Sequence, residues 1–287
     1  MRFYRRWRWG ILLLGLVVLA PVFPVAKPAA CAEKPLWELG AGLALLQIPD
    51  YVGSDKNRIY LLPYPYFIYR GDILQVERER VSGRIFNTDA VLLDFSLYGH
   101  VPVKSSDNDA RTGMPDLDPT FELGPALNIT LLENRQEHYK LNLALPVRPV
   151  FSTNFTSLRH EGWIFSPRLT FEKADFISGT GWNLGISAGP IFADSGYNSY
   201  YYSVDPAYAT ASRPSYAAGG GYDGSSITIG LNKGYKQLVF TAFVSATVLQ
   251  GAIIEDSPLV KSRYSVMSGI AVSWTFLKSP KSVTADR

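Results

Sequence analysis

Three histidines, His100, His138 and His160, are the residues whose chemistry first draws attention. A hydrolytic site would need one of them close to a serine and to an acidic or amide partner. His100 lies near the end of an expected strand, His138 lies in a short turn, and His160 lies between Arg159 and Glu161. No family-specific spacing joins any of the three to a serine. We therefore expect a protein without enzymatic activity and without catalytic residues.

One acidic stretch could in principle bind a cation, because hard cations such as Ca²⁺ prefer carboxylate oxygens. It contains Asp107, Asp109, Asp116 and Asp118 but no ordered Asp/Asn/Gly repeat. A glycine run at 219–221 is followed by neither a lysine nor a helix pattern, so it does not resemble a phosphate-binding loop. We expect a solvated acidic loop, no metal site and no cofactor.

A tyrosine cluster could bind a partner through its rings, because tyrosine combines a large apolar surface with a polar tip. The cluster lies in the longest connection and consists of Tyr197, Tyr200, Tyr201 and Tyr202. One interpretation is a contact surface for a glycan or a protein. The other is an interface girdle or a loop folded into the interior, and the sequence leaves both open.

The elements that carry these residues alternate between apolar and polar positions. In YSVMSGIAVSWTF, every second residue from Tyr264 to Phe276 is bulky and apolar, apart from Ser268. The same period of two predicts strands at 121–131, 139–148, 163–172, 182–192 and 238–248. No linker divides the chain, so we expect a single all-β domain.

Two folds produce such alternation: a β-sandwich with one wet face, and a barrel whose outer face meets lipid and whose lumen is polar. Three features favour the barrel. The segments are long enough for tilted strands to cross a bilayer. Aromatic residues concentrate near segment ends, as at Trp37, Trp163, Trp182, Tyr235, Tyr264, Trp274 and Phe276. Charge is confined to the other face, at Glu38, Asp94, Glu122, Lys140, Arg148, Arg168 and Glu172. Pairing between these charges would fill the lumen.

Connection lengths indicate an orientation. Short turns are expected at 133–137, 175–179 and Lys233-Gly234 on the periplasmic side, and long connections at 104–118, 193–222 and 250–261 outside. With both termini periplasmic, the stretch from Ile73 to Phe86 must form two short strands. The fold class is then a transmembrane antiparallel up-and-down β-barrel of about twelve strands, with about ten as the alternative.

The N-terminal residues indicate export. Four arginines precede an uncharged run at 10–26, and Ala30-Cys31-Ala32 fits a cleavage site, so residues 1–32 are expected to be a secretory signal peptide. A retained anchor and a lipoprotein at Cys31 are the alternatives. Cleavage changes 28 basic and 25 acidic residues to 23 and 25, a net charge of −2. Nucleic-acid binding loses its electrostatic basis, and without Cys31 the mature chain has no disulfide.

The aromatic end of the last strand, with Trp274 and Phe276, resembles the C-terminal signal by which the barrel-assembly machinery recognises outer-membrane barrels. That signal usually ends the protein, whereas here a polar tail follows. The expected division is therefore a signal peptide at 1–32, a barrel at 33–276 and a polar tail at 277–287.

Several stretches resemble the MipA/OmpV family of Gram-negative outer-membrane proteins. They are Tyr51-Val52-Gly53-Ser54-Asp55, Pro63-Tyr64-Pro65 leading to Tyr69-Arg70-Gly71-Asp72, Tyr201-Tyr202-Ser203-Val204 with downstream Tyr216 and Gly219-Gly220, and Ser257-Pro258-Leu259-Val260. The stretches follow the family's order over the whole mature chain. The resemblance implies an outer-membrane barrel that scaffolds a lytic transglycosylase and a murein synthase, or that maintains the envelope.

Physical roles can be assigned to the same residues. Gly53 and Gly71 suit tight turns, and Pro63 and Pro65 remove ladder donors, so that strand should be bulged or weakly paired on one side. Asp55, Arg70 and Asp72 are candidates for ion pairs at the barrel rim. We favour this structural role of the motifs over direct contact with a partner.

Two other functions stay open: a small diffusion pore or channel, and a surface adhesin acting through the long outer loops. A lumen filled with paired charge would oppose transport. Short periplasmic turns offer little area for a scaffold, because a stable interface needs about 800 Å² on each partner. If the protein is a scaffold, we expect the tail from Leu277 or the extreme N-terminus to contribute.

Overall fold

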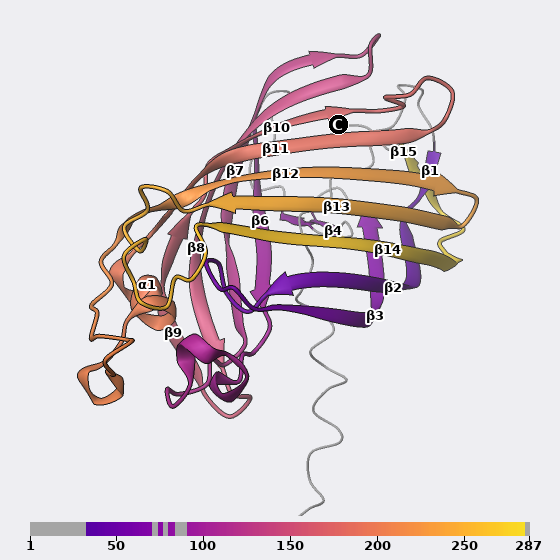
Figure 1. Ribbon diagram of the computed structural model, residues 1–287. Helices are drawn as coiled ribbons and strands as arrows, with labels where there is room; N and C mark the ends of the chain where they lie inside the picture. Colours follow the sequence, from indigo (N-terminus) through magenta and orange to yellow (C-terminus); the bar gives the residue numbers. More distant parts are fainter. Residues whose placement is uncertain (1–32, 71–73, 77–79, 84–90, 285–287) are drawn as a thin grey trace, which may run out of the picture.

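The computed structural model describes residues 33–70, 74–76, 80–83 and 91–284 (Figure 1), so the expected signal peptide lies outside the described residues. The strands are β1 (Glu33–Pro35), β2 (Trp37–Pro49), β3 (Asn57–Arg70), β4 (Leu74–Val76), β5 (Arg80–Gly83), β6 (Val91–His100), β7 (Thr120–Asn134), β8 (Tyr139–Thr153), β9 (Leu158–Phe165), β10 (Arg168–Lys173), β11 (Trp182–Ala193), β12 (Gly221–Tyr235), β13 (Leu238–Val248), β14 (Tyr264–Lys278) and β15 (Ser282–Thr284). The α-helix is α1 (Ser195–Tyr202), and short 3₁₀ turns occupy Ser105–Asp107, Asp109–Arg111 and Pro206–Tyr208.

From β2 to β9, and again from β10 to β14, each strand pairs in antiparallel fashion with the next one along the chain. Strand β14 returns to pair with β2, from Ser268 with Gln47 to Lys278 with Glu38. The strand expected at 163–172 is present as two pieces, β9 and β10, and each pairs with β8 on one side and β11 on the other. The break falls at Ser166-Pro167, where the proline has no N–H for the ladder.

The link between β3 and β6 is the thinnest part of the sheet. It runs through β4 and β5, and β4 pairs with β3 only at Tyr69 and Arg70. These are the two short strands expected between Ile73 and Phe86. Residues 71–73, 77–79 and 84–90 of this corner, including Gly71 and Asp72, lie outside the described residues. The number of strands around the barrel therefore stays a prediction.

The alternation sorts side chains as expected, with the bulky apolar face outward. Along β14, Ile270 and Trp274 are exposed whereas Ser265 and Ser273 are buried. The exposed apolar residues are spread over the long strands: Leu43, Leu45, Ile59, Leu61, Phe67, Phe95, Leu123, Leu131, Val147, Trp163, Phe165, Leu169, Phe192, Ile227, Ile229, Phe240, Val244, Val266, Ile270 and Val272. The outer face of this sheet is thus apolar, which reverses the arrangement of a water-soluble sheet.

The inner face carries paired charge and close packing. Arg148 Nε donates to Glu122 Oε2 at 2.8 Å, and both side chains are almost fully buried. Glu38 pairs with Arg70 at 2.7 Å. Glycine is favoured opposite the tyrosines of β3, since a Cβ on Gly40 would overlap the ring of Tyr66. Paired interior charge is what the sequence predicts.

Strand β3 contains the two prolines that were expected to weaken its pairing. Pro63 and Pro65 lie within the register with β2, opposite Leu43 and Ala41. On the other edge, the described residues of β3 pair only near its end, with β4. The register with β2 has no bulge, and a proline cannot donate to a second neighbour. Weak pairing on the other edge stays a prediction, because residues 71–73, 77–79 and 84–90 lie outside the described residues.

One turn differs from the expectation. The turn placed at Lys233-Gly234 lies at Lys236-Gln237, because β12 continues through Gly234, which pairs with Val239. Lys236 itself adopts the left-handed backbone conformation, with φ of 55°. The turn therefore forms without a glycine.

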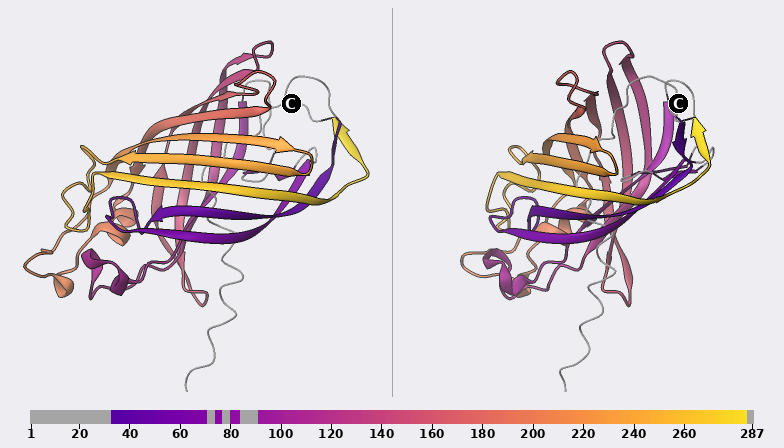
Figure 2. Two further views of the ribbon diagram at one scale, coloured as in Figure 1. Left: turned by 45° about the vertical axis from the view of Figure 1, so that its right-hand side comes forward. Right: turned by 90° about the vertical axis from the view of Figure 1, so that its right-hand side faces the viewer.

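The two ends of the described chain pair with each other. β1 and β15 form a two-stranded sheet with Glu33 opposite Thr284 (Figure 2). Leu36 N–H also donates to the Lys281 carbonyl at 2.8 Å, and Ser279 N–H donates to the Trp37 carbonyl at 2.8 Å. The polar tail thus folds back onto the N-terminal segment. In the described part of the chain, no helix is long and apolar enough to cross a membrane.

Candidate functional site at the loop end

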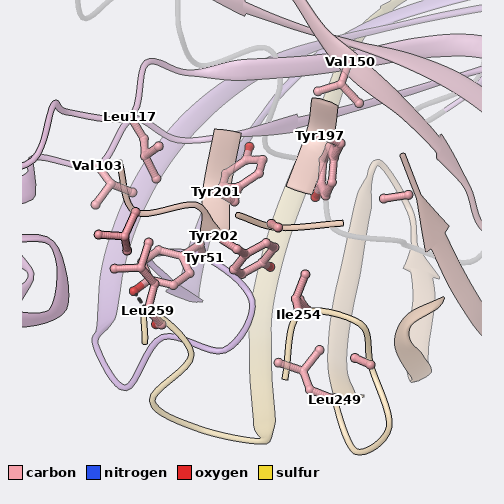
Figure 3. Close-up of a cluster of buried hydrophobic side chains, with 14 of the residues drawn as sticks. Tyr51, Val103, Leu117, Val150, Tyr197, Tyr201, Tyr202, Leu249, Ile254 and Leu259 are labelled. Carbon is pink, nitrogen blue, oxygen red and sulfur yellow. Dashed lines mark hydrogen bonds between the residues drawn. The ribbon is translucent and has the colours of Figure 1, made fainter. Parts of the chain in front are cut away.

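The connections at 50–56, 101–119, 194–220 and 249–263 gather at one end of the sheet, here called the loop end (Figures 1 and 3). The opposite end, with the short turns at 135–138, 174–181 and 236–237, is called the turn end. The connections of the loop end build a buried apolar cluster of Tyr51, Val103, Ala110, Leu117, Val150, Ile164, Ala193, Tyr197, Tyr201, Tyr202, Val204, Ala218, Leu249, Ala252, Ile254 and Leu259. The larger of the two buried apolar clusters in the described part of the chain therefore lies at the loop end, between the connections and the adjoining ends of β8, β9 and β11.

Helix α1 places the tyrosines in this cluster. Asp194 caps the helix, because its Oδ1 accepts the Tyr197 N–H at 2.9 Å. Asn198 Nδ2 donates to the Gly219 carbonyl and to Asp223 Oδ1, both at 2.8 Å. A Cβ on Gly220 would lie 2.7 Å from the Ser195 nitrogen, so only glycine fits beside the start of the helix.

Two tyrosines link stretches that are far apart in the sequence. Tyr51 Oη donates to the Leu259 carbonyl at 2.8 Å, and Tyr202 Oη donates to the Val52 carbonyl at 3.0 Å. Ser257 Oγ donates to the Tyr202 carbonyl at 2.7 Å. The rings of Tyr51 and Tyr202 meet edge to face at 6.2 Å (Figure 3). Three of the stretches that carry the family resemblance therefore meet at one point.

The remaining loop-end motif residues join the same assembly. Gly53 has φ of 89°, and its carbonyl accepts the N–H groups of Lys261 and Ser262 at 2.8 and 3.0 Å. Tyr216 Oη donates to the Ile253 carbonyl at 3.1 Å. Pro258 lies between two buried residues, Ser257 and Leu259. The predicted structural role of these motif residues agrees with this geometry.

Burial keeps these phenols neutral. It raises the pKa of Tyr51 to about 12, although the Arg111 guanidinium lowers this pKa in part. Burial also raises the pKa of Tyr197 and of Tyr202 well above the ordinary tyrosine value. A neutral phenol can donate to a carbonyl, as Tyr51 and Tyr202 do here, whereas a phenolate cannot.

Polar side chains brace the cluster from its edge. Buried Arg111 donates from Nη1 to the Tyr201 carbonyl at 3.1 Å, and burial lowers the pKa of its guanidinium. Asp50 binds Arg58 Nε at 2.6 Å and Asn108 Nδ2 at 2.8 Å. Sequence reasoning missed Arg111 and Asn108. The signal in the sequence that could have indicated a buried loop was the presence of apolar residues, such as Val103 and Leu117, among polar ones.

Two sequence interpretations change at this end. Tyr197, Tyr201 and Tyr202 are buried, so the interpretation in which the loop folds inward describes these three residues. Asp55, predicted to form a rim ion pair, is exposed and pairs with no described cation, because Asp50 is the carboxylate that faces Arg58.

The acidic loop and the histidines have separate partners. Asp107, Asp109 and Asp118 pair with Arg58, Lys56 and Arg159, and Asp116 Oδ1 accepts the Ser105 N–H. His100 Nε2 lies 3.2 Å from Glu122 Oε1, next to the Arg148 pair. His160 packs between the rings of Phe151 and Trp163.

The turn end holds the other predicted residues, of which Tyr69 and Arg70 are partly buried and Trp274 and Phe276 are exposed. Arg70 Nη1 donates to the Pro35 carbonyl at 2.8 Å, in addition to its ion pair with Glu38, and Tyr69 stacks on Phe67. Trp274 and Phe276 are exposed, with ring centroids 5.7 Å apart. The structure thus brings together the motif residues of the loop end, whereas the predicted residues of the turn end do not join that assembly.

Comparison with known proteins gives one strong match. Residues 41–276 match the family model described as MltA-interacting protein MipA. No curated protein matches the chain. A bacterial polysaccharide outer membrane secretin is similar at 8% identity and a TM-score of 0.41, over 84% of this chain and 99% of that one. Outer membrane phospholipase A from Escherichia coli is similar at 10% identity and a TM-score of 0.33, over 86% and 93%. The outer membrane protease OmpT from Escherichia coli is similar at 8% identity and a TM-score of 0.31, over 87% and 100%.

Proposed function

The chain belongs to the MltA-interacting protein MipA family, and from this premise we propose that it is a non-enzymatic outer-membrane β-barrel that scaffolds murein-synthesising and murein-hydrolysing enzymes. In this proposal the loop end lies outside the cell, and the turn end lies in the periplasm with both termini. A closed barrel of about twelve strands is part of the proposal.

The observation that carries the membrane location is the apolar outer face. Large apolar side chains are exposed on β2, β3, β7, β12, β13 and β14, among others. Soluble monomers rarely expose contiguous apolar patches larger than a few hundred Å², whereas lipid-facing strands alternate in this way. The pairing of β14 with β2, and of β10 with β8, supports closure of the sheet.

The packing at the loop end supports a scaffold over a diffusion pore. A pore needs a continuous wet path, but here four connections bury an apolar cluster, and Leu249, Leu259 and Val150 are inaccessible to solvent. Below it, Glu122 and Arg148 pair in the interior. These contacts support a sealed outer end.

The paired termini are the proposed docking element. A stable interface needs about 800 Å² on each partner, and short turns alone present little area. β1 and β15 add a second small sheet at the turn end. From the family name and resemblance, the partners are an MltA-like lytic transglycosylase and a murein synthase.

Site-specific photocrosslinking in cells tests this function. A photoreactive residue at exposed Lys281, next to β15, should capture a lytic transglycosylase. The same residue at Tyr208, exposed at the loop end, is the matched control and should not capture it. Capture from neither position would contradict the scaffold. Steady conductance steps of the folded protein in a planar bilayer would instead favour the pore.

A further inference from the structure

The outer face is hollowed at the turn end, beside the turn between β12 and β13. The hollow is open and has a volume of about 510 Å³. It is lined by Tyr235, Lys236, Gln237, Leu238 and Trp274. Aromatic walls with a lysine and an amide at the rim can bind a ligand that is part apolar and part anionic.

Backbone and side-chain hydrogen bonds fix the shape of the hollow. Tyr235 and Leu238 are opposite each other, and Leu238 is opposite Trp274 on β14. Trp274 Nε1 donates to Gln237 Oε1 at 3.0 Å, and the Gln237 carbonyl accepts the Thr275 N–H at 2.9 Å. The indole and the turn therefore hold each other in place before any ligand binds.

Two lysines of this region lie over aromatic rings. Lys236 Nζ is 5.5 Å from the Tyr235 ring centroid, and Lys233 Nζ is 5.7 Å from the ring of Trp182. At the turn end, the described ion pairs join Arg70 with Glu38 and Arg135 with Glu133. On the turn between β10 and β11, Asp175 accepts the N–H groups of Gly179 and Gly181 at 2.7 and 2.6 Å. Each ammonium group therefore lies over an aromatic ring near the turn end, where it can also contact an external anion.

The hollow continues into the apolar outer face. Leu238 lines the hollow, and Phe240 and Val272, the next outward pair along these strands, are exposed. A ligand bound here would have its charged part at the lysines and an apolar part along the strands. A phospholipid has that form, because its phosphate adjoins its acyl chains, whereas a glycan has no apolar chain to lie against Phe240.

We propose that this hollow binds the headgroup of an anionic phospholipid, with Lys236, which lines the hollow, binding the phosphate, and with Leu238, Phe240 and Val272 contacting an acyl chain. Lys233, two positions before Tyr235 on the same face of β12, adds a second positive charge beside the hollow. The site rests on the proposed function, since it requires the outer face to meet lipid. It adds a preferred lipid class and a fixed position. The turn end would thereby be anchored to the leaflet at the side of β12, β13 and β14.

The test compares lipid retention by native mass spectrometry. Folded protein is inserted into phosphatidylcholine vesicles doped with phosphatidylglycerol, and insertion is confirmed by the heat-dependent gel shift. The variant K233Q/K236Q keeps unbranched polar side chains and removes both charges. The matched control K104Q/K261Q removes two exposed lysines at the loop end. We expect the site variant to retain phosphatidylglycerol about thirtyfold less tightly, and the control to resemble the original chain.

Other outcomes overturn the proposal at different levels. Equal retention by K233Q/K236Q and the original chain would remove the site and leave the membrane location intact. Displacement of the lipid by free glycerol phosphate, or by a murein glycan fragment, at matched concentration would show that another ligand occupies the hollow. Failure of the original chain to insert into either lipid would overturn the proposed function together with the site.

Discussion

At the loop end, Tyr202 donates to the carbonyl of Val52 across 150 positions of sequence. At the turn end, Asp175 accepts N–H groups only four and six positions away, from Gly179 and Gly181. The first kind of contact exists only when several connections are folded together. The second forms within one turn and needs nothing else. The loop end should therefore respond to mutation as a protein core does, whereas the short turns of the turn end should respond one by one, as surface parts.

The largest expected difference between the two ends concerns ion pairs. Glu122→Leu leaves the nearly buried Arg148 without its carboxylate, so the free energy of unfolding should fall by about 3–5 kcal/mol. Urea unfolding in vesicles measures it. Glu133→Gln breaks a pair with Arg135 at the turn end, where both side chains are exposed, and should change little. E122L/R148M should recover most of the loss. If E122L and E133Q lowered the free energy of unfolding equally, the predicted difference between the two ends would be wrong.

Alkaline pH should loosen the loop end first. Because the pKa of Tyr51 is raised to about 12, the folded state holds a proton that the opened state releases above pH 10. Stability is therefore lost as pH rises from about 10 to 12, by about 2–3 kcal/mol. Phenolate absorbance with limited proteolysis of the loops follows this change. Tyr51→Phe should lessen the pH dependence, and loops that resist proteolysis unchanged to pH 12 would contradict it.

Buried and exposed positions can also be compared within one connection, by removing a single tyrosine hydroxyl from each. Tyr202→Phe leaves the Val52 carbonyl without its donor and should lower the free energy of unfolding by about 1–2 kcal/mol. Tyr208→Phe, in the same connection but exposed, serves as the control and should have no measurable effect. The midpoints of urea unfolding compare the two variants. Indistinguishable midpoints would mean that the buried network is not cooperative.

The smallest effect is expected at the turn end. Trp274→Phe removes the hydrogen bond to Gln237 but keeps an aromatic ring at an exposed position, so the loss should be about 0.5–1 kcal/mol. The aromatic assembly signal is retained, and the yield of heat-modifiable protein in the outer membrane should be unchanged. A large drop in yield would show that the indole N–H, and not only the ring, is needed for assembly.

Periodic segments were the part of the fold that could be predicted from sequence. The strand expected at 238–248 coincides with β13, and the apolar side of β14 faces outward as predicted. Period-two alternation reports directly on which face a side chain occupies. The break between β9 and β10 was not foreseen, although Pro167 was its visible cause.

The loop end could be predicted only in part. The motif residues were recognised, but that Tyr51, Tyr202 and Ser257 meet was not, because contacts between irregular connections have no periodic pattern. The orientation of the tyrosine cluster was left open for the same reason. Arg111 is buried and donates to a backbone carbonyl group. The sequence shows no paired carboxylate that would have indicated this burial.

The pairing of β14 with β2 joins strands that are far apart in the sequence, since Ser268 and Gln47 are 221 positions apart. Contacts of such high contact order form late, after hairpins such as β12 with β13. A circular permutant would relieve this. Glu33 and Thr284 are already opposite each other, so a short linker could join them, and new ends could open in the exposed tip at 154–157. The slowest pairing of the natural chain would then become a local one.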